Sequence, residues 1–232
     1  MSNYTAEDAL VWKTLFERQA QNLMDKGARS YLQALENMNE ALNEKHVPCF
    51  EDINIWFTKV TGWQIEVVPG LIEVERFFKL LAQKKFCSST WLRSKKNLDY
   101  IEEPDMFHDI FGHIPLLSNP VFSDYVYEFG KLGFKYIDDK ERLVQLQRLY
   151  WFTIEFGVIK ENDQIKSYGA GIISSFGETN QIHRHEATFL PFDIHAILNK
   201  SFHTDEMQTE YFVIDSLEQL YESLEMVKAE LR

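Results

Sequence analysis

The sequence has little cysteine, no excess of positive charge and no long hydrophobic run. Its two cysteines, Cys49 and Cys87, are far apart and form no CxxC pattern, which excludes a disulfide framework and favours a reducing compartment, the cytoplasm. The formal net charge of −12 argues against nucleic acid or an anionic membrane surface as a partner. No stretch approaches the roughly 20 apolar residues that a membrane-spanning helix needs. The N-terminus also lacks the apolar run that is typical of a signal peptide.

The residues that are present favour a folded protein with a large core. Hydrophobic residues make up 45% of the 232 positions and aromatic residues 14%, which excludes a disordered chain. We find no internal repeat and no low-complexity linker, so the length suits one domain over residues 1–232. Helical spacing of apolar residues dominates, and short strand patterns interrupt it. The sequence therefore predicts a mostly α fold of the α+β type, a helical domain with short β-strands.

Several segments carry clear secondary-structure signals. Thr5, with Asp8 three residues later, is typical of a capped helix start. The apolar pattern predicts a helix over 71–86, and residues 158–169 indicate a hairpin with its turn at "END". Between residues 217 and 231 apolar side chains recur at spacings of three and four, too briefly for a coiled coil. We expect this last helix to dock on the protein's own core.

The stretch "PDMFHDIFGHIPLL", residues 104–117, holds two histidines in otherwise apolar company. A buried polar group without a partner costs a few kcal/mol, so His108 and His113 need partners. Five residues apart, they lie about 140° apart around an ideal helix and do not share a face. They can converge if the helix ends or distorts between them, which Gly112 and Pro115 favour. Proline disfavours helical geometry at the preceding residue, so we expect His113 at or near the helix end.

A third candidate is Glu155, in the apolar stretch "RLYWFTIEFG". Bare burial would raise the pKa of this carboxyl and leave it neutral, whereas a metal ion would hold it ionised. A position on an exposed helix edge is the alternative. Two histidines and one carboxylate on one face of an ion are typical of non-haem Fe(II) oxygenases. They also occur in zinc hydrolases, and ligand types alone do not separate the two. The aromatic surroundings favour oxygen chemistry, because a reactive oxidant needs water excluded.

A second histidine cluster, "HRHEA", contains His183, His185 and Glu186. Alternate residues of a strand share a face, so a metal pair is geometrically allowed there. Arg184 and the polar residues before the cluster favour a solvated loop instead. We rank this cluster well below the first set.

Five blocks of the sequence together resemble one family, the pterin-dependent aromatic amino acid hydroxylases, and most closely the short bacterial phenylalanine 4-monooxygenases. The blocks run in family order from about residue 50 to residue 222. They are "VVPGLIEVERFFKLLAQKKF", "LDYIEEPDMFHDIFGHIPLLSNPVFSDY", "RLYWFTIEFGVI", "YGAGIISSFGE" and "YFVIDSLEQL". The resemblance implies a single catalytic domain without a regulatory domain or a long tetramerisation helix, and a monomer.

The resemblance also implies roles for individual residues. It gives His108, His113 and Glu155 as catalytic iron ligands, and Arg93 as the group that holds the substrate carboxylate, for which a planar guanidinium is suited. The other implied substrate residues are Ile101, Trp151, Ser174 and Glu178. The implied pterin residues are Gly70, Ile72, Phe77, Asp109 and Tyr150, with Phe77 as the stacking ring. Asp109 could orient the pterin or a water, or instead contact a histidine.

The implied reaction converts L-phenylalanine, O2 and a tetrahydropterin into L-tyrosine and a hydroxylated pterin at Fe(II), and it implies a pterin-recycling enzyme. Thr204 departs from the pattern, because the phenylalanine enzymes usually carry an aliphatic residue there, facing the pocket. Tryptophan or tyrosine therefore stays open as the substrate, although Trp151 argues against tryptophan. A zinc-dependent hydrolase and a non-catalytic binding protein are more remote alternatives. A non-catalytic protein would be expected to have lost one of the metal-ligand positions, whereas all three ligands are present.

Overall fold

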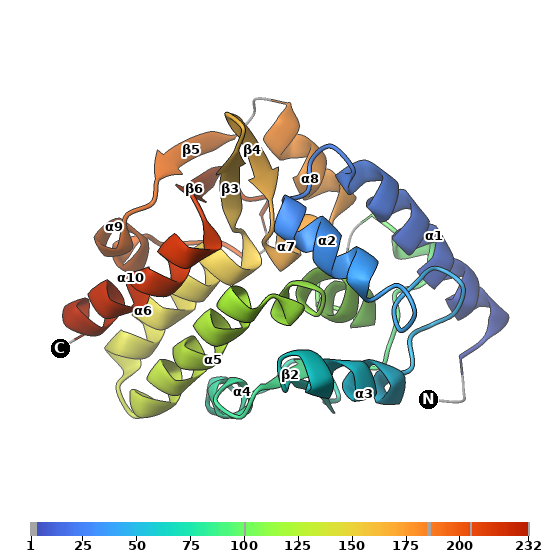
Figure 1. The fold of residues 1–232 in the computed structure, drawn as a ribbon, viewed down its shortest axis with the longest axis horizontal. Coiled ribbons are helices and arrows are strands. Elements are labelled where there is room, and N and C mark those ends of the chain that lie inside the picture. The colour runs from blue at the N-terminus through green and yellow to red at the C-terminus, as the bar shows by residue number, and fades with distance from the viewer. Residues whose placement is uncertain (1–3, 100, 185–186, 205, 232) are drawn as a thin grey trace.

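The computed structural model describes residues 4–99, 101–184, 187–204 and 206–231. The elements of the first half are α1 (Ala6–Leu23), α2 (Arg29–Asn37), α3 (Phe50–Val60), β1 (Gln64–Val67), α4 (Val74–Leu81), β2 (Lys85–Ser88), η1 (Lys95–Asn97), η2 (His108–His113), η3 (Leu116–Ser118) and α5 (Pro120–Lys135). Those of the second half are α6 (Lys140–Tyr150), η4 (Trp151–Glu155), β3 (Val158–Glu161), β4 (Gln164–Ser167), α7 (Ala170–Ile173), α8 (Phe176–His183), β5 (Thr188–Pro191), α9 (Ile194–Asn199), β6 (Glu210–Ile214) and α10 (Leu217–Glu230). The predicted mostly helical α+β class is confirmed (Figure 1).

The strands form two small sheets. One has the order β4-β3-β6-β5, in which β3 is antiparallel to β4 and parallel to β6, and β5 is parallel to β6. The other pairs β1 with β2 in parallel. Asn162 and Asp163 both have positive φ in the turn between β3 and β4, which confirms the predicted hairpin. In Figure 1 the four-stranded sheet lies at the top of the view, with α5, α6 and α10 running below it.

One large cluster of buried hydrophobic side chains extends from α1 to α10. The apolar positions of α10 belong to it, and α10 packs against α5. The expected docking of the C-terminal helix on the core is thus confirmed. At the other end, the side chain of Thr5 accepts from the backbone of Asp8 while Asp8 accepts from the backbone of Thr5, which is the predicted capping box. Among the described helices, none is both long and apolar enough to cross a membrane.

The predicted helix over 71–86 is correct only in its middle. The helix α4 covers Val74–Leu81, and Lys84 follows it with φ of 54°. This left-handed residue turns the chain back, so that Lys85 and Phe86 pair with Gln64 and Ile65 of β1. The apolar pattern continues across the boundary, but a contact with a distant strand decides the conformation.

Candidate metal centre

His108 and His113 are brought together by a π-helical turn. The segment His108–His113 is wound with i→i+5 bonds, so residues five apart lie over one another instead of on different faces. As a result the Nε2 atoms of the two histidines are 3.2 Å apart. The expected distortion between them is therefore present, as a widened turn. Such turns in helices are frequent at functional sites.

The π-helical segment ends at His113, as expected, but the expected loss of helical geometry before Pro115 is wrong, because Ile114 and Pro115 both keep helical backbone angles. In an α-helix the N–H at position 115 would bond to the carbonyl of Phe111, and proline has no N–H. The Tyr31 hydroxyl donates to that carbonyl instead, over 2.6 Å. A side chain of α2 thus satisfies the backbone group that proline leaves open, and helical backbone angles continue beyond the last residue of the turn, His113.

Glu155 completes the set from a second π-helical turn, Trp151–Glu155. Its Oε1 lies 3.3 Å from Nε2 of His108, and its Oε2 lies 3.2 Å from Nε2 of His113. The carboxylate is largely buried, so the alternative of an exposed helix edge is wrong. Among the described residues, this is the only group of three whose ligand atoms lie close enough together to hold a metal ion.

The hydrogen bonds around His108 fix which of its nitrogens faces the centre. Ser174 Oγ donates to the carbonyl of Ala170 over 2.8 Å, so it accepts from Nδ1 of His108 at 2.9 Å. The Nε2 atom of a neutral His108 then carries a lone pair. Burial lowers the pKa of His108 to about 4, which keeps the ring neutral at pH 7.

This donor set fits a cation. Burial would raise the pKa of Glu155, but the positive charge that His108 and His113 carry when protonated, together with the hydrogen bond from His113, outweighs burial and holds the pKa below its usual value. An ionised carboxylate therefore faces an imidazole lone pair across little more than 3 Å. Such an arrangement is repulsive unless a proton or a metal ion lies between the atoms. Two histidines and a carboxylate suit a divalent transition metal with open positions.

Arg93 lies beside this centre and is already engaged. Its Nε and Nη2 atoms each donate to a carboxylate oxygen of Asp105, both over 2.8 Å, and both side chains are buried. Asp105 also accepts from the backbone N–H of His108. Burial alone would raise the pKa of Asp105, but Arg93 holds it below the usual value. Sequence reasoning missed Asp105, although an acidic residue in the apolar block of His108 was a usable signal.

Glu178 and Trp151 share a buried network rather than an open pocket wall. The backbone N–H of Gln208 and the hydroxyl of Tyr211 donate to Glu178, at 3.1 and 3.0 Å. The indole of Trp151 donates to the side chain of Gln208, and its ring stacks on Phe202 at 4.5 Å between centroids. Burial raises the pKa of Glu178. Gln208, Tyr211 and Phe202 carried no signal in the sequence, because only tertiary contacts bring them here.

Two of the residues that were predicted to bind a pterin, Phe77 and Tyr150, connect α4 to His113. The ring of Phe77 meets Tyr150 edge-on at 5.2 Å, and Tyr150 lies parallel to His113 at 6.3 Å. Phe86, which sequence reasoning missed, lies against His113 at 4.5 Å. Asp109 accepts from the backbone of Ser89, and its burial raises its pKa to about 7. The aromatic rings thus form a line that leads from α4 to a ligand.

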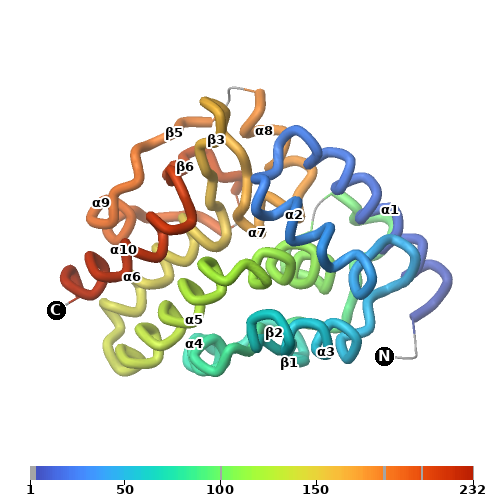
Figure 2. The backbone as a smooth tube through the Cα atoms, viewed as in Figure 1, coloured from blue at the N-terminus to red at the C-terminus, as the bar shows by residue number. Residues whose placement is uncertain are grey.

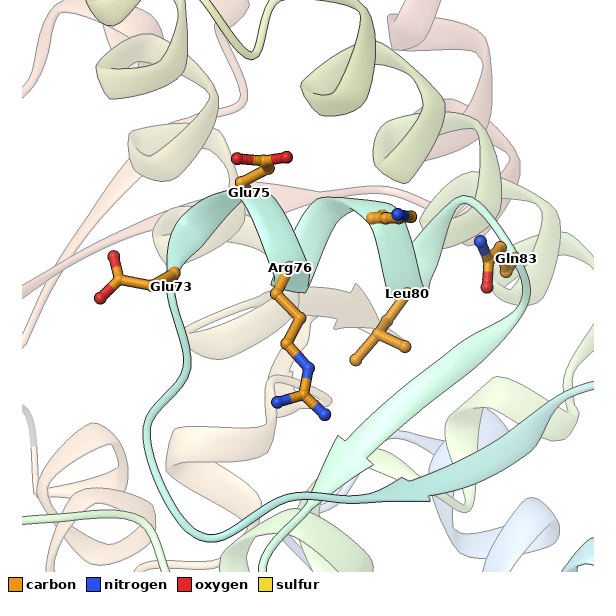
Figure 3. Close-up of a pocket in the computed structure, with 6 residues that line it drawn as sticks. Glu73, Glu75, Arg76, Leu80 and Gln83 are labelled. Carbon is orange, nitrogen blue, oxygen red and sulfur yellow. The ribbon is translucent and has the colours of Figure 1, made fainter.

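The other predicted residues that the structure describes lie in loops. Gly70 and Ile72 are half-buried in the loop before α4, with open space at Gly70. Ile101 is half-buried, and Thr204 is exposed. In the rival cluster, His185 and Glu186 lie outside the described residues. A hollow also lies beside α4 (Figure 3). Its wall consists of Glu73, Glu75, Arg76, Lys79, Leu80 and Gln83. None of the residues assigned above to the metal or the pterin lines this hollow.

Comparison with known proteins identifies the family. The sequence profile described as biopterin-dependent aromatic amino acid hydroxylase matches residues 1–232. The chain belongs to this family. It is 42% identical over 221 residues to the phenylalanine-4-hydroxylase of Ralstonia nicotianae, covering 95% of this chain and 70% of that protein.

Two crystal structures of the phenylalanine hydroxylase of Chromobacterium violaceum have the same hydroxylase fold. One, with bound iron(III) and oxidised 7,8-dihydrobiopterin, gives a TM-score of 0.92 at 40% identity, covering 99% of this chain and 83% of that one. The other, bound to cobalt, gives 0.92 at 39% identity, covering 98% and 83%. The predicted hydroxylase fold is therefore confirmed at high similarity.

Proposed function

We propose that this protein is a non-haem iron monooxygenase that hydroxylates L-phenylalanine to L-tyrosine, with O2 and a tetrahydropterin as co-substrates. The observation that carries the proposal is the convergence of His108, His113 and Glu155, whose ligand atoms all lie within 4.8 Å of one another. The family and the names of its relatives support iron, a biopterin and phenylalanine. Fe(II) is the metal that this donor set would hold.

The protein's own residues would position the reactants. Fe(II) and a reduced pterin supply the O2 activation that hydroxylation of an aromatic ring requires. Ser174 keeps a proton on Nδ1 of His108 and thereby leaves Nε2 free for the metal. Phe77 offers a ring face for a pterin, backed by Tyr150. The buried aromatic surroundings of Glu155 keep water out.

Arg93 is proposed to bind the substrate carboxylate through one particular edge. A guanidinium has five N–H donors. Asp105 takes the Nε–Nη2 edge and Nη1 also donates to the Leu98 carbonyl over 3.4 Å, which leaves one N–H each of Nη1 and Nη2 for a second carboxylate. Asp105 also bonds to the backbone of His108, so the proposed substrate anchor and the proposed metal ligand share one support. This link would fix the distance between the substrate backbone and the metal.

The other substrate residues are proposed to shape the pocket. Trp151 presents a ring held by Gln208 and Phe202, which supports a rigid aromatic wall. Ile101 is proposed as a further apolar contact. Glu178 is proposed to act on the amino-acid end of the substrate through its network, and Gly70, Ile72 and Asp109 to bind the pterin. Because Thr204 departs from the usual aliphatic residue, tryptophan and tyrosine are kept as test substrates.

Product analysis tests the proposal. Purified protein loaded with Fe(II) is incubated with O2, a tetrahydropterin and either phenylalanine, tyrosine or tryptophan. We expect tyrosine from phenylalanine, and we expect its formation to require both iron and pterin. A hydroxylated product from tryptophan or tyrosine alone would agree with the family assignment but would contradict phenylalanine as the substrate. Zinc-dependent hydrolysis without O2 or pterin would favour the hydrolase alternative.

The ligand assignment needs its own variant. Glu155→Ala removes the only carboxylate of the donor set and should abolish iron-dependent turnover in a protein that still folds, as measured by circular dichroism. Glu222→Ala, at an exposed position of α10, serves as the control and should keep full activity. Full activity of Glu155→Ala would overturn the site.

We also propose that residues 1–232 act as one catalytic domain, that the protein is a monomer, and that it works in the cytoplasm beside a pterin-recycling enzyme. The single large core cluster supports the first point, and the two free cysteines support a reducing compartment. Light scattering would test the second point, because a monomer has a mass of 27.4 kDa.

A further inference from the structure

The short helix α7 lies against both segments that carry the metal ligands. A Cβ atom on Gly112 of the first π-helical turn would come within 2.9 Å of the Ala170 carbonyl, and one on Gly171 would come within 2.8 Å of Oε1 of Glu155. Only glycines allow this approach. Any shift of α7 is therefore transmitted to the ligands. What holds α7 in place matters for the metal centre.

A four-residue helix cannot satisfy its own carbonyl groups. The Ala170 carbonyl accepts from the backbone and side chain of Ser174, and the Ile172 carbonyl accepts from Ser175 N and Thr179 Oγ1. The Ile173 carbonyl, directly before Ser174, needs a partner from elsewhere. Its donor decides the position of the turn that carries Ser174.

That donor is Gln19 of α1. Its Nε2 atom donates to the Ile173 carbonyl over 2.7 Å and to Thr179 Oγ1 over 2.9 Å. The side chain is only 2% exposed, and it reaches residues 154 positions further along the sequence. Figure 2 shows α1 beside α8, and the two helices are in contact. Both hydrogens of this buried amide are hydrogen-bonded. The side chain is therefore held in place, because breaking either bond would leave a buried polar group unsatisfied.

We propose that Gln19 is a positioning residue for the metal ligand His108. Gln19 holds the turn at Ile173, the turn holds Ser174, and Ser174 fixes the tautomer and direction of the His108 ring. The inference rests on the proposed function, since it takes His108 as a ligand. It assigns a role in the metal centre to the N-terminal helix, which contributes no ligand. Ser174 is a partner of the kind that typically changes metal affinity by about 10- to 100-fold, and Gln19 acts on the centre through Ser174.

The test uses Gln19→Met, which keeps the length of the side chain and removes the donor. Thr179→Val is a second, milder variant that removes the hydroxyl between Gln19 and the Ile172 carbonyl. Val11→Ala is the matched control, because it removes buried volume from α1 two turns away without touching the turn at Ser174. Folding of each variant is checked by circular dichroism and urea denaturation.

Cobalt is the probe, because its visible absorption reports ligand geometry. We expect the full-length wild type to bind Co(II). Gln19→Met should bind Co(II) about tenfold more weakly and show an altered spectrum. Val11→Ala should keep the wild-type affinity and spectrum but be less stable. A second measurement needs no metal. In the ¹⁵N NMR spectrum of metal-free protein, we expect His108 of the wild type to be protonated at Nδ1 alone, and the variant to show mixed tautomers.

The outcomes separate the two proposals. If the wild type binds no cobalt, both the proposed metal centre and the inference about Gln19 are wrong. If the wild type binds and Gln19→Met gives the same affinity, spectrum and tautomer, only the inference is overturned. If Gln19→Met does not fold, Thr179→Val decides by the same readouts. Equal losses of affinity in Gln19→Met and Val11→Ala would mean that α1 acts only through stability, and would also overturn it.

Discussion

The hydroxyl of Tyr31 donates a 2.6 Å hydrogen bond to the carbonyl of Phe111, 80 residues away in the sequence. Both residues are fully buried. The carbonyl lies in the π-helical turn between the two histidines, where Pro115 cannot supply the α-helical donor. One side chain of α2 thus stabilises the backbone geometry on which the histidine pair depends.

Tyr31→Phe should therefore destabilise the protein. The substitution keeps the ring and leaves a buried carbonyl without a donor, which costs about 1–3 kcal/mol. Urea denaturation would measure the change. Tyr168→Phe is the matched control, because the Tyr168 hydroxyl is buried with no hydrogen-bond partner among the described residues. That variant should lose nothing, and an equal loss in both would contradict the assigned role of the Tyr31 bond.

Asp105→Asn should affect both stability and substrate binding. It leaves the buried guanidinium of Arg93 without its charge partner, and breaking a buried pair costs about 3–5 kcal/mol. Since Arg93 is the proposed carboxylate anchor, KM for phenylalanine should rise more than kcat falls. Thermal denaturation and steady-state kinetics would check the two effects.

An exposed pair provides the comparison for Asp105→Asn. Asp99 contacts Arg18 at 2.6 Å, but its side chain is 83% exposed. Asp99→Asn should therefore cost no more than about 1 kcal/mol and leave KM unchanged. If Asp105→Asn behaved like this control, the buried pair would have no special part in the site.

The fold could be predicted where the signals are local. The capping pair of Thr5 and Asp8 and the turn at Asn162 and Asp163 are signals of this kind, and both are confirmed. The start of β2 could not be predicted, because Phe86 continues the apolar pattern of α4 and joins the strand only by pairing with β1. Contacts between distant segments override local preference there.

The site could be predicted in its residue types but not in its supports. Two histidines and a glutamate in apolar stretches indicated a metal, and the structure brings them together. The π-helical turns have no local signature, so the spacing of His108 and His113 looked unfavourable. Asp105 and Gln208 carry polar groups whose partners are set by the tertiary structure. Sequence patterns do not contain that information.

Cys87 should resist alkylation in the native protein. Burial, with the charge of Asp109 as the next cause, raises the pKa of its thiol to about 12. Because the thiolate is the reactive form, iodoacetamide at pH 8 should modify it on the order of a thousandfold more slowly than a free thiol. Peptide mapping by mass spectrometry, with urea-unfolded protein as the reference, would measure the rate. Native Cys87 reacting as fast as in urea would contradict the prediction.

The buried carboxyl of Glu178 should make stability fall as pH rises. Burial raises its pKa above that of the unfolded chain, so between the two values the folded state binds more protons. Stability contributed by the protonated form is full below the unfolded pKa and is lost as pH rises through the folded pKa. Glu178→Gln cannot titrate and keeps an acceptor for the Gln208 N–H.

The stability of Glu178→Gln relative to wild type should therefore increase from about pH 4.5 upward, where an ordinary glutamate is about half ionised. Melting temperatures measured between pH 4.5 and pH 8 would show a widening difference in favour of the variant. Glu222→Gln, at an exposed position of α10, should follow the wild-type profile throughout. A difference that narrows as pH rises would mean that Glu178 is stabilised as the ion, because Gln208 and Tyr211 would then outweigh the burial of the charge.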